Sequence, residues 1–221
     1  MGDFLLEMQK FFNETLIGTV MEVVQILPDS IVIMTGLYAL LTLSASFAVM
    51  FLGLLESTLL FQVIQRTALY LGTAEGTTLT EAKCRTGFRT ADFTTLSMFS
   101  RDIRPSFPSA PLYILSVASA YIFSSLQAQS EELQALGTAY SSRYYISLTL
   151  LCTLILVFML ARLYNECDSF SSLIATVPIG LGIGALIFEQ NRRLFGPMMV
   201  NLLGIPLIAN KATISVCTPK A

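Results

Sequence analysis

The sequence predicts an all-α membrane protein with about four transmembrane helices. Of its 221 residues, 54% are hydrophobic and only 13% are charged, and the apolar residues lie in long uninterrupted blocks. Soluble domains carry about 25% charged residues, which give them a solvated surface. Apolar blocks of about 20 residues are typical of helices that lie in hydrocarbon. We therefore expect the chain to be a multi-pass membrane protein in contact with a lipid bilayer.

Residues 1–29 predict an amphipathic helix that precedes the membrane-spanning part. Apolar residues recur from Leu5 to Leu27 at nearly the 3.6-residue period, with acidic residues mainly on the other side. Pro28 and Asp29 interrupt the pattern, and we expect the helix to end there. A helix in an anionic interface usually has a basic polar face, so this acidic face favours docking on a partner or on the bundle itself.

Residues 30–71 predict the first transmembrane helix and an extension beyond the membrane. The apolar run Ile31–Leu55 ends at Glu56. As a helix it is roughly 37 Å long, which is enough to cross a bilayer with some tilt. The helical pattern continues to about Leu71, so this helix is expected to emerge from the bilayer.

Residues 72–108 form the largest polar stretch, which we predict to be a contact surface for other proteins. It opens with a glycine-rich turn, and prolines near its end favour extended backbone. Phenylalanines interleave with the basic residues, so the segment is expected to be ordered. Basic side chains suit anionic lipid heads or an acidic protein. The residues expected to contact a partner are Arg85, Arg89, Arg101, Arg104 and Phe107.

Residues 109–189 predict three further transmembrane helices, over Ala110–Leu126, Tyr144–Leu163 and Phe170–Phe188. The last of these follows a tight turn at residues 165–169. In residues 190–221, the apolar run from Phe195 to Ala209 is short and contains glycine and proline. This part is expected to be interfacial or re-entrant, with a polar tail after it.

Small residues spaced four apart predict close helix packing within the bundle, with a dimer face as the alternative. Small side chains let two helix backbones approach in a membrane. The pairs are Gly180 and Gly184 in the fourth span, Ser116 and Ala120 in the second, and Ser44 and Ala48 in the first.

The composition argues against an enzyme. Histidine is absent, which removes the commonest general base and metal ligand, and no two of the four cysteines form a C-x-x-C pair. We expect no catalytic residue, no cofactor and no metal site. A net charge of −2 gives no basic field for nucleic acid.

The predicted spans contain no charged residue in their interiors. Glu56, Arg162 and Glu189 fall at predicted helix ends, where they are expected to reach water. Ion-coupled carriers usually place ionisable residues inside the membrane, so this argues against proton-coupled antiport and leaves a passive channel open. Basic residues are nearly balanced between the two sides, and we expect the 72–108 loop on the cytoplasmic side.

The run Val200–Lys211, followed by Ile214 and Cys217, resembles a segment of uncharacterised polytopic membrane proteins of large icosahedral algal DNA viruses. The stretch Gly87–Phe93 resembles them more faintly. The resemblance implies a virion protein of the internal membrane that ties the membrane to the capsid. It implies no functional residue.

The function that the sequence favours is structural: a membrane assembly protein that anchors or bridges neighbouring proteins, alone or as a homo-oligomer. Two alternatives remain at this stage. One is a passive channel or small-solute transporter, which would be complete as a monomer or homo-oligomer. The other is an accessory subunit of a membrane enzyme complex.

Overall fold

The computed structural model describes residues 18–72, 76–77, 104–105, 107–130 and 138–202. In these ranges the chain forms long α-helices, one 3-10 helix and two strands of two residues each. The helices are α2 (Gly18–Thr42), α3 (Ala45–Tyr70), α4 (Ala110–Ala128), α6 (Thr138–Tyr164), α7 (Phe170–Phe195) and η3 (Pro197–Val200), and the strands are β1 (Gly76–Thr77) and β2 (Arg104–Pro105).

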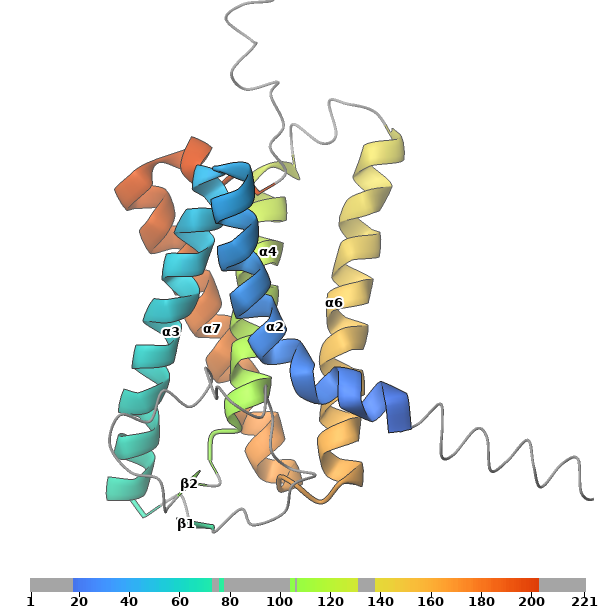
Figure 1. Ribbon diagram of the computed structural model, residues 1–221, viewed down its shortest axis with the longest axis vertical. Helices are drawn as coiled ribbons and strands as arrows, with labels where there is room; N and C mark the ends of the chain where they lie inside the picture. The colour runs from blue at the N-terminus through green and yellow to red at the C-terminus, as the bar shows by residue number, and fades with distance from the viewer. Residues whose placement is uncertain (1–17, 73–75, 78–103, 106, 131–137, 203–221) are drawn as a thin grey trace, which may run out of the picture.

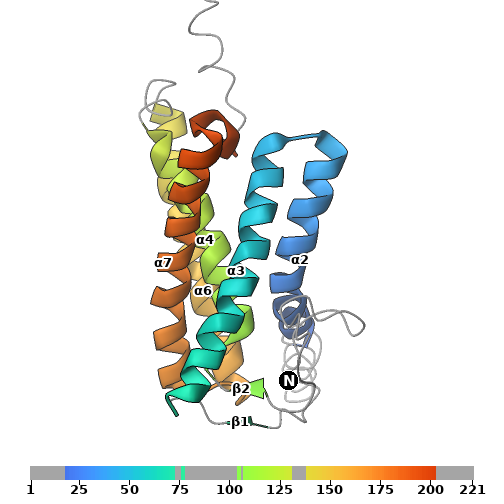
Figure 2. The ribbon, with the colours of Figure 1, turned by 90° about the vertical axis from the view of Figure 1, so that its left-hand side faces the viewer.

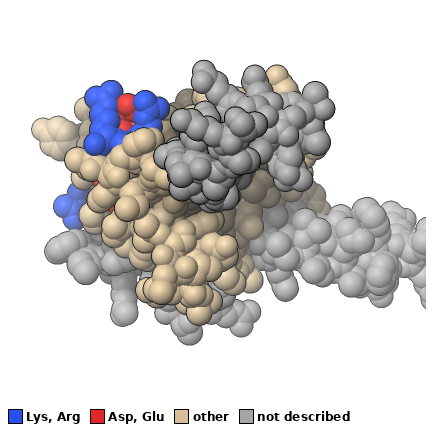
Figure 3. Space-filling view, turned by 90° about the horizontal axis from the view of Figure 1, so that it is seen from above, with Lys and Arg blue, Asp and Glu red and all other residues tan. Residues whose placement is uncertain are grey.

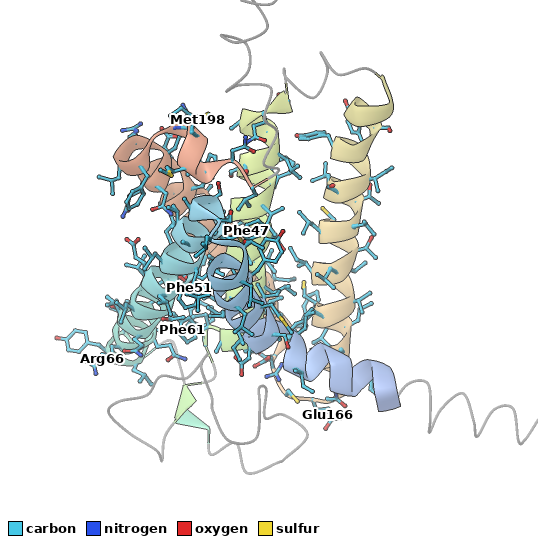
Figure 4. All side chains as sticks on the ribbon, turned by 45° about the horizontal axis from the view of Figure 1, so that its top comes forward. Phe47, Phe51, Phe61, Arg66, Glu166 and Met198 are labelled. Carbon is cyan, nitrogen blue, oxygen red and sulfur yellow. The ribbon has the colours of Figure 1, made fainter. Side chains whose placement is uncertain are left out.

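The long helices form one bundle around α4 (Figures 1 and 2). Every residue from Pro111 to Tyr121 is buried, so α4 is the core helix. The strands and the α6–α7 turn lie at one end of the bundle, the loop end, and η3 lies at the other, the η3 end. Arg66 and Glu166 mark the loop end and Met198 the η3 end (Figure 4).

Four helices are long and apolar enough to cross a membrane: Ala45–Tyr70, Ala110–Ala128, Tyr144–Tyr164 and Phe170–Phe195. The protein buries 72% of the apolar window in α4 but only 17% of that in α6. Large apolar side chains such as Leu150 and Leu160 of α6 are exposed on the bundle surface, where hydrocarbon is their natural solvent. The predicted polytopic all-α membrane fold is confirmed.

The first predicted span is wrong in one respect: residues 31–55 are not one helix. The chain turns at Leu43, whose φ is 51°, and Ser44 has extended backbone as the N-cap of α3. Residues 31–42 therefore belong to α2, which runs back along α3 as a helical hairpin (Figure 2). The predicted extension to Leu71 is the second half of α3, the helix that has the length and hydropathy to cross.

The expected helix end at Pro28 is also wrong, because Pro28 lies inside α2. Proline removes one backbone hydrogen bond and crowds the preceding turn, and a helix in an apolar setting can continue through it with a bend. The ribbon of α2 bends along its length and its first turns cross toward α6 (Figure 1). Residues 1–17 of the predicted amphipathic helix lie outside the described residues.

The three later spans agree with prediction, since α4, α6 and α7 cover the expected apolar runs with a few more residues at their ends. Beyond α7, Gly196 has a φ of 87° and redirects the chain into η3, which packs on the core through Val200. Of the predicted interfacial segment 195–209, residues after 202 lie outside the description.

Aromatic residues fill the contacts between α2, α3 and α4. Phe47, Phe51 and Phe61 follow one another along α3 (Figure 4). The ring of Phe47 meets Tyr38 of α2 with centroids 4.5 Å apart, and that of Phe61 meets Tyr113 of α4 at 4.9 Å. These ring contacts pack α2 against α3 and α3 against the core helix α4.

Candidate functional site

The small residues of α7 and α4 form the tightest helix contact in the bundle. A Cβ built on Gly180 would lie 2.6 Å from the Cβ of Ser116, and one on Gly184 would meet the backbone oxygen of Val117 and lie 2.8 Å from the Cβ of Ala120. Two of the three predicted pairs thus face one another. Their small size lets two spans meet backbone to backbone.

The third pair lies elsewhere. Ser44 caps α3 in the hairpin turn, and the backbone N–H of Ala48 donates to the Ser44 carbonyl at 3.1 Å. Two glycines that the sequence analysis did not single out also lie at close helix contacts, one in α3 and one in α2. A Cβ on Gly53 would lie 2.8 Å from the Cγ2 of Ile187, and one on Gly36 would lie 2.9 Å from the Phe51 ring. A lone glycine in an apolar run gives no signal of this kind.

A buried ion pair joins α6 to the turn before α7 at the loop end. The Arg162 Nε donates to the Asp168 Oδ2 at 2.7 Å, and the two side chains are only 7% and 6% exposed. Ser109, the N-cap of α4, donates its hydroxyl to the same carboxylate oxygen at 2.7 Å. Its backbone N–H donates to the Thr176 hydroxyl at 3.1 Å. Three helices thus meet at one carboxylate.

Arg162 was expected to reach water at the end of its helix, and it does not. The chain reverses just after α6: Glu166 has a φ of 55° and the N–H of Cys167 donates to the Arg162 carbonyl at 3.0 Å. This turn carries Asp168 back over the end of α6, so the arginine is neutralised and covered.

The same turn carries a disulfide-bonded cysteine, Cys167, whose partner lies outside the described residues. Cys152, in the middle of α6, is free and exposed on the bundle surface. The turn at the loop end is therefore held by covalent and ionic links together.

The residues predicted to contact a partner are mostly outside the structure's description. Arg85, Arg89 and Arg101 are not described, and Arg104 is described only as backbone in β2. Phe107 is half-buried just before α4. What the structure adds is the base of the loop: Gly76 pairs with Pro105 and Thr77 with Arg104 in an antiparallel register. We call this pair of strands the stem.

A second polar cluster lies between α3 and α7, toward the η3 end. The Gln190 Nε2 donates to both carboxylate oxygens of Glu56, at 3.0 and 3.2 Å. Beside it, the Asn191 Nδ2 donates to the Val49 carbonyl at 3.4 Å and lies 3.3 Å from the Tyr121 hydroxyl oxygen. The close approach of the two helices at Gly53 brings these side chains together.

Glu56 is not at a helix end, as had been expected, but near the middle of a candidate membrane span. It lies eleven residues after Ala45 and fourteen before Tyr70, the ends of α3. The expectation failed because the apolar run before Glu56 belongs to two helices and not to one. Asp29 was missed because the helix was expected to end at Pro28 and Asp29, whereas α2 continues through them and buries Asp29 fully.

Glu189 is at a helix end as expected, in the last turns of α7. Its Oε1 accepts a hydrogen bond from the Arg193 Nε at 2.9 Å, and its Oε2 forms an ion pair with the Arg192 Nε at 3.5 Å. Seen from the η3 end, most of the described surface is uncharged, and the charged side chains in view lie toward one side of it (Figure 3).

The fold and these clusters define a polytopic membrane protein whose polar contacts join helices within the bundle and at its two ends. The chain matches no protein-family model, no curated protein and no solved structure.

Proposed function

We propose that the protein is a non-catalytic membrane assembly protein that anchors neighbouring proteins through its 72–108 segment. The stem carries this proposal. It joins the two ends of the segment at Thr77 and Arg104, so residues 78–103 leave and return at one point on the bundle. A segment with both ends fixed is suited to present a contact surface at a set position.

The base under the stem is braced against three helices. Ser109, four residues after Pro105, is bound by the Asp168 carboxylate and the Thr176 hydroxyl. Arg162 neutralises that carboxylate in a site shielded from water. A buried ion pair of this kind fixes the geometry of the chain more than it adds stability. A fixed geometry under the stem suits a segment that binds a partner.

The filled centre of the bundle supports an anchoring role over a single-chain pore. The central helix α4 buries Tyr113 and Tyr121, two of the largest fully buried side chains, on the axis where a channel would run. Around them pack Phe61 of α3 and Phe188 of α7. A transporter remains the second candidate, and Glu56 is the observation in its favour.

The test is retention of partners by the full-length chain extracted in mild detergent. With Arg101→Ala and Arg104→Ala together, we expect stoichiometric partners to be lost while the chain stays folded. The matched control is Arg192→Ala with Arg193→Ala, which removes two arginines at the opposite end and should leave partners bound. Equal retention by both double variants would contradict the role of the loop. A homo-oligomer without other proteins would favour the transporter.

A more specific proposal concerns which membrane the protein occupies. From the resemblance of its C-terminal run, we propose the internal membrane of an icosahedral virion, with the loop bridging lipid and capsid. Fractionation of purified virions tests it: the chain should stay with the particle after surface proteolysis and leave it only on detergent extraction. Release with external membranes before extraction would exclude this location.

A further inference from the structure

We propose that Glu56 is a proton-binding site inside the membrane, held by Gln190 and open toward the η3 end. The inference does not depend on the anchoring role of the loop. It rests on where α3 begins, what surrounds the Glu56 carboxyl group and how a carboxyl group is tolerated in hydrocarbon.

The depth of Glu56 follows from the length of α3. Its 26 residues make a helix about 39 Å long, against a hydrocarbon layer of about 30 Å. Glu56 lies about 16 Å from one end and about 21 Å from the other. If the whole excess projects at the nearer end, Glu56 is still about 7 Å inside the hydrocarbon.

A carboxylate at that depth needs a compensating cation or a proton, because a bare charge in hydrocarbon is costly. The described part of the chain brings no cation to Glu56. Arg192 and Arg193 of α7 are engaged by Glu189. On α4, the Tyr113 hydroxyl donates to the Ser57 carbonyl and the Tyr121 hydroxyl meets Asn191. Asp29, on α2, is another acid.

Gln190 suits a carboxyl group that gains and loses a proton. Its amide has a donor, which the structure aims at both Glu56 oxygens, and an acceptor that serves the protonated form. A proton from water adds to one carboxylate oxygen, and the other oxygen keeps the amide hydrogen bond.

The Glu56 carboxyl group is close to water only on the side of the η3 end. Gln190 adjoins Glu189, whose side chain is 38% exposed at the polar end of α7. Toward the loop end, the Glu56 side of α3 continues as Leu59, Leu60 and Val63, which are exposed apolar side chains suited to lipid. Protons are therefore expected to exchange with the η3 side.

The test uses dicyclohexylcarbodiimide, a hydrophobic reagent that modifies protonated carboxyl groups. The acid O–H adds across one C=N bond, and the O-acylisourea rearranges to a stable N-acylurea with no leaving group. Full-length protein in liposomes is treated, digested and mapped by mass spectrometry. We expect label on Glu56, a labelling rate that falls as pH rises, and no label there from a water-soluble carbodiimide.

Two variants locate the reaction. Glu56→Gln should abolish the label, while Glu166→Gln, an exposed acid in the turn at the loop end, should leave it in place. The wild-type peptide map decides the matter even if a variant fails to fold. A Glu56 that stays unlabelled while Glu189 reacts would overturn the proposal. So would equal reaction of Glu56 with the hydrophobic and the water-soluble reagents, because the carboxyl group would then face bulk water.

Discussion

Arg162 and Asp168 are six residues apart and on opposite sides of a chain reversal, yet their side chains meet at 2.7 Å with almost no exposure to solvent. The carboxylate also accepts from the Ser109 hydroxyl, so one oxygen joins the end of α6, the start of α7 and the start of α4. Removing the Asp168 carboxylate would take a buried counter-ion from Arg162 and a hydrogen-bond acceptor from Ser109.

Asp168→Ala is therefore expected to destabilise the bundle by about 3–5 kcal/mol, the usual cost of breaking a buried ion pair. Unfolding by denaturant in a fixed detergent, followed by circular dichroism, measures it. The control is Arg193→Ala, which breaks an exposed pair with Glu189 worth about 0–1 kcal/mol. Similar losses for the two variants would show that the Arg162 site is open to water.

Gly184→Ala is expected to cost about 1–3 kcal/mol, because the new methyl group would overlap the backbone oxygen of Val117, which cannot move aside. Gly182→Ala is the matched control, since a Cβ there meets nothing within 4 Å. Thermal unfolding in detergent compares the two. A stable Gly184→Ala variant would mean that α4 and α7 are further apart than described.

Tyr113→Phe is expected to cost about 0.5–1.5 kcal/mol, since it removes the buried hydrogen bond from the tyrosine hydroxyl to the Ser57 carbonyl at 3.1 Å. The same change at Tyr145, which is exposed, should have no measurable effect. Both variants can be compared by their denaturant midpoints. No loss at Tyr113 would argue that the α3–α4 contact is apolar alone.

Leu43→Gly is expected to stabilise the α2–α3 hairpin by about 0.5–1 kcal/mol, because glycine adopts the left-handed backbone of this turn without the steric cost of a Cβ. Leu41→Gly, inside the helix and equally exposed, should instead lose about 1 kcal/mol. Melting temperatures of the two variants should move in opposite directions. A melting temperature lowered by both would place residues 31–55 in a single helix after all.

Cys152 is expected to resist water-soluble maleimides in intact membranes despite its exposure on the bundle. Cys152 lies within a candidate membrane span, on the surface that faces hydrocarbon, where a water-soluble reagent does not partition. Labelling should appear after unfolding in sodium dodecyl sulfate. Cys167 should stay unlabelled there until a reductant is added. Fast labelling of Cys152 in membranes would place the middle of α6 in water.

The sequence predicted the parts of the fold that depend on the length of apolar runs. Spans α4, α6 and α7 each lie between polar connections, so composition marks the apolar part of each helix, although α6 begins before and α7 ends beyond the predicted bounds. The break at Leu43 was hidden because a turn at a membrane hairpin can be as apolar as the helices it joins. Misplacing that break moved Glu56 to a helix end, and the helix end expected at Pro28 hid the burial of Asp29.

Close helix packing was predicted from spacing within single helices, but which helices would meet was not. Gly180 and Gly184 are four residues apart, and their partners Ser116 and Ala120 share that spacing. The contact of Arg162 with Asp168 and that of Glu56 with Gln190 depend on a turn and on a helix crossing. Neither contact produces a periodic pattern in the sequence from which it could be predicted.

The stem has a consequence for engineering. Since Thr77 and Arg104 are already joined, lengthening the chain between them adds little to the entropy of closing it, with each doubling costing about 0.6 kcal/mol. The chain between residues 78 and 103 is thus expected to accept an insertion. An epitope, a fluorescent domain or a foreign binding peptide inserted there should be displayed at a known point while the membrane helices fold as before.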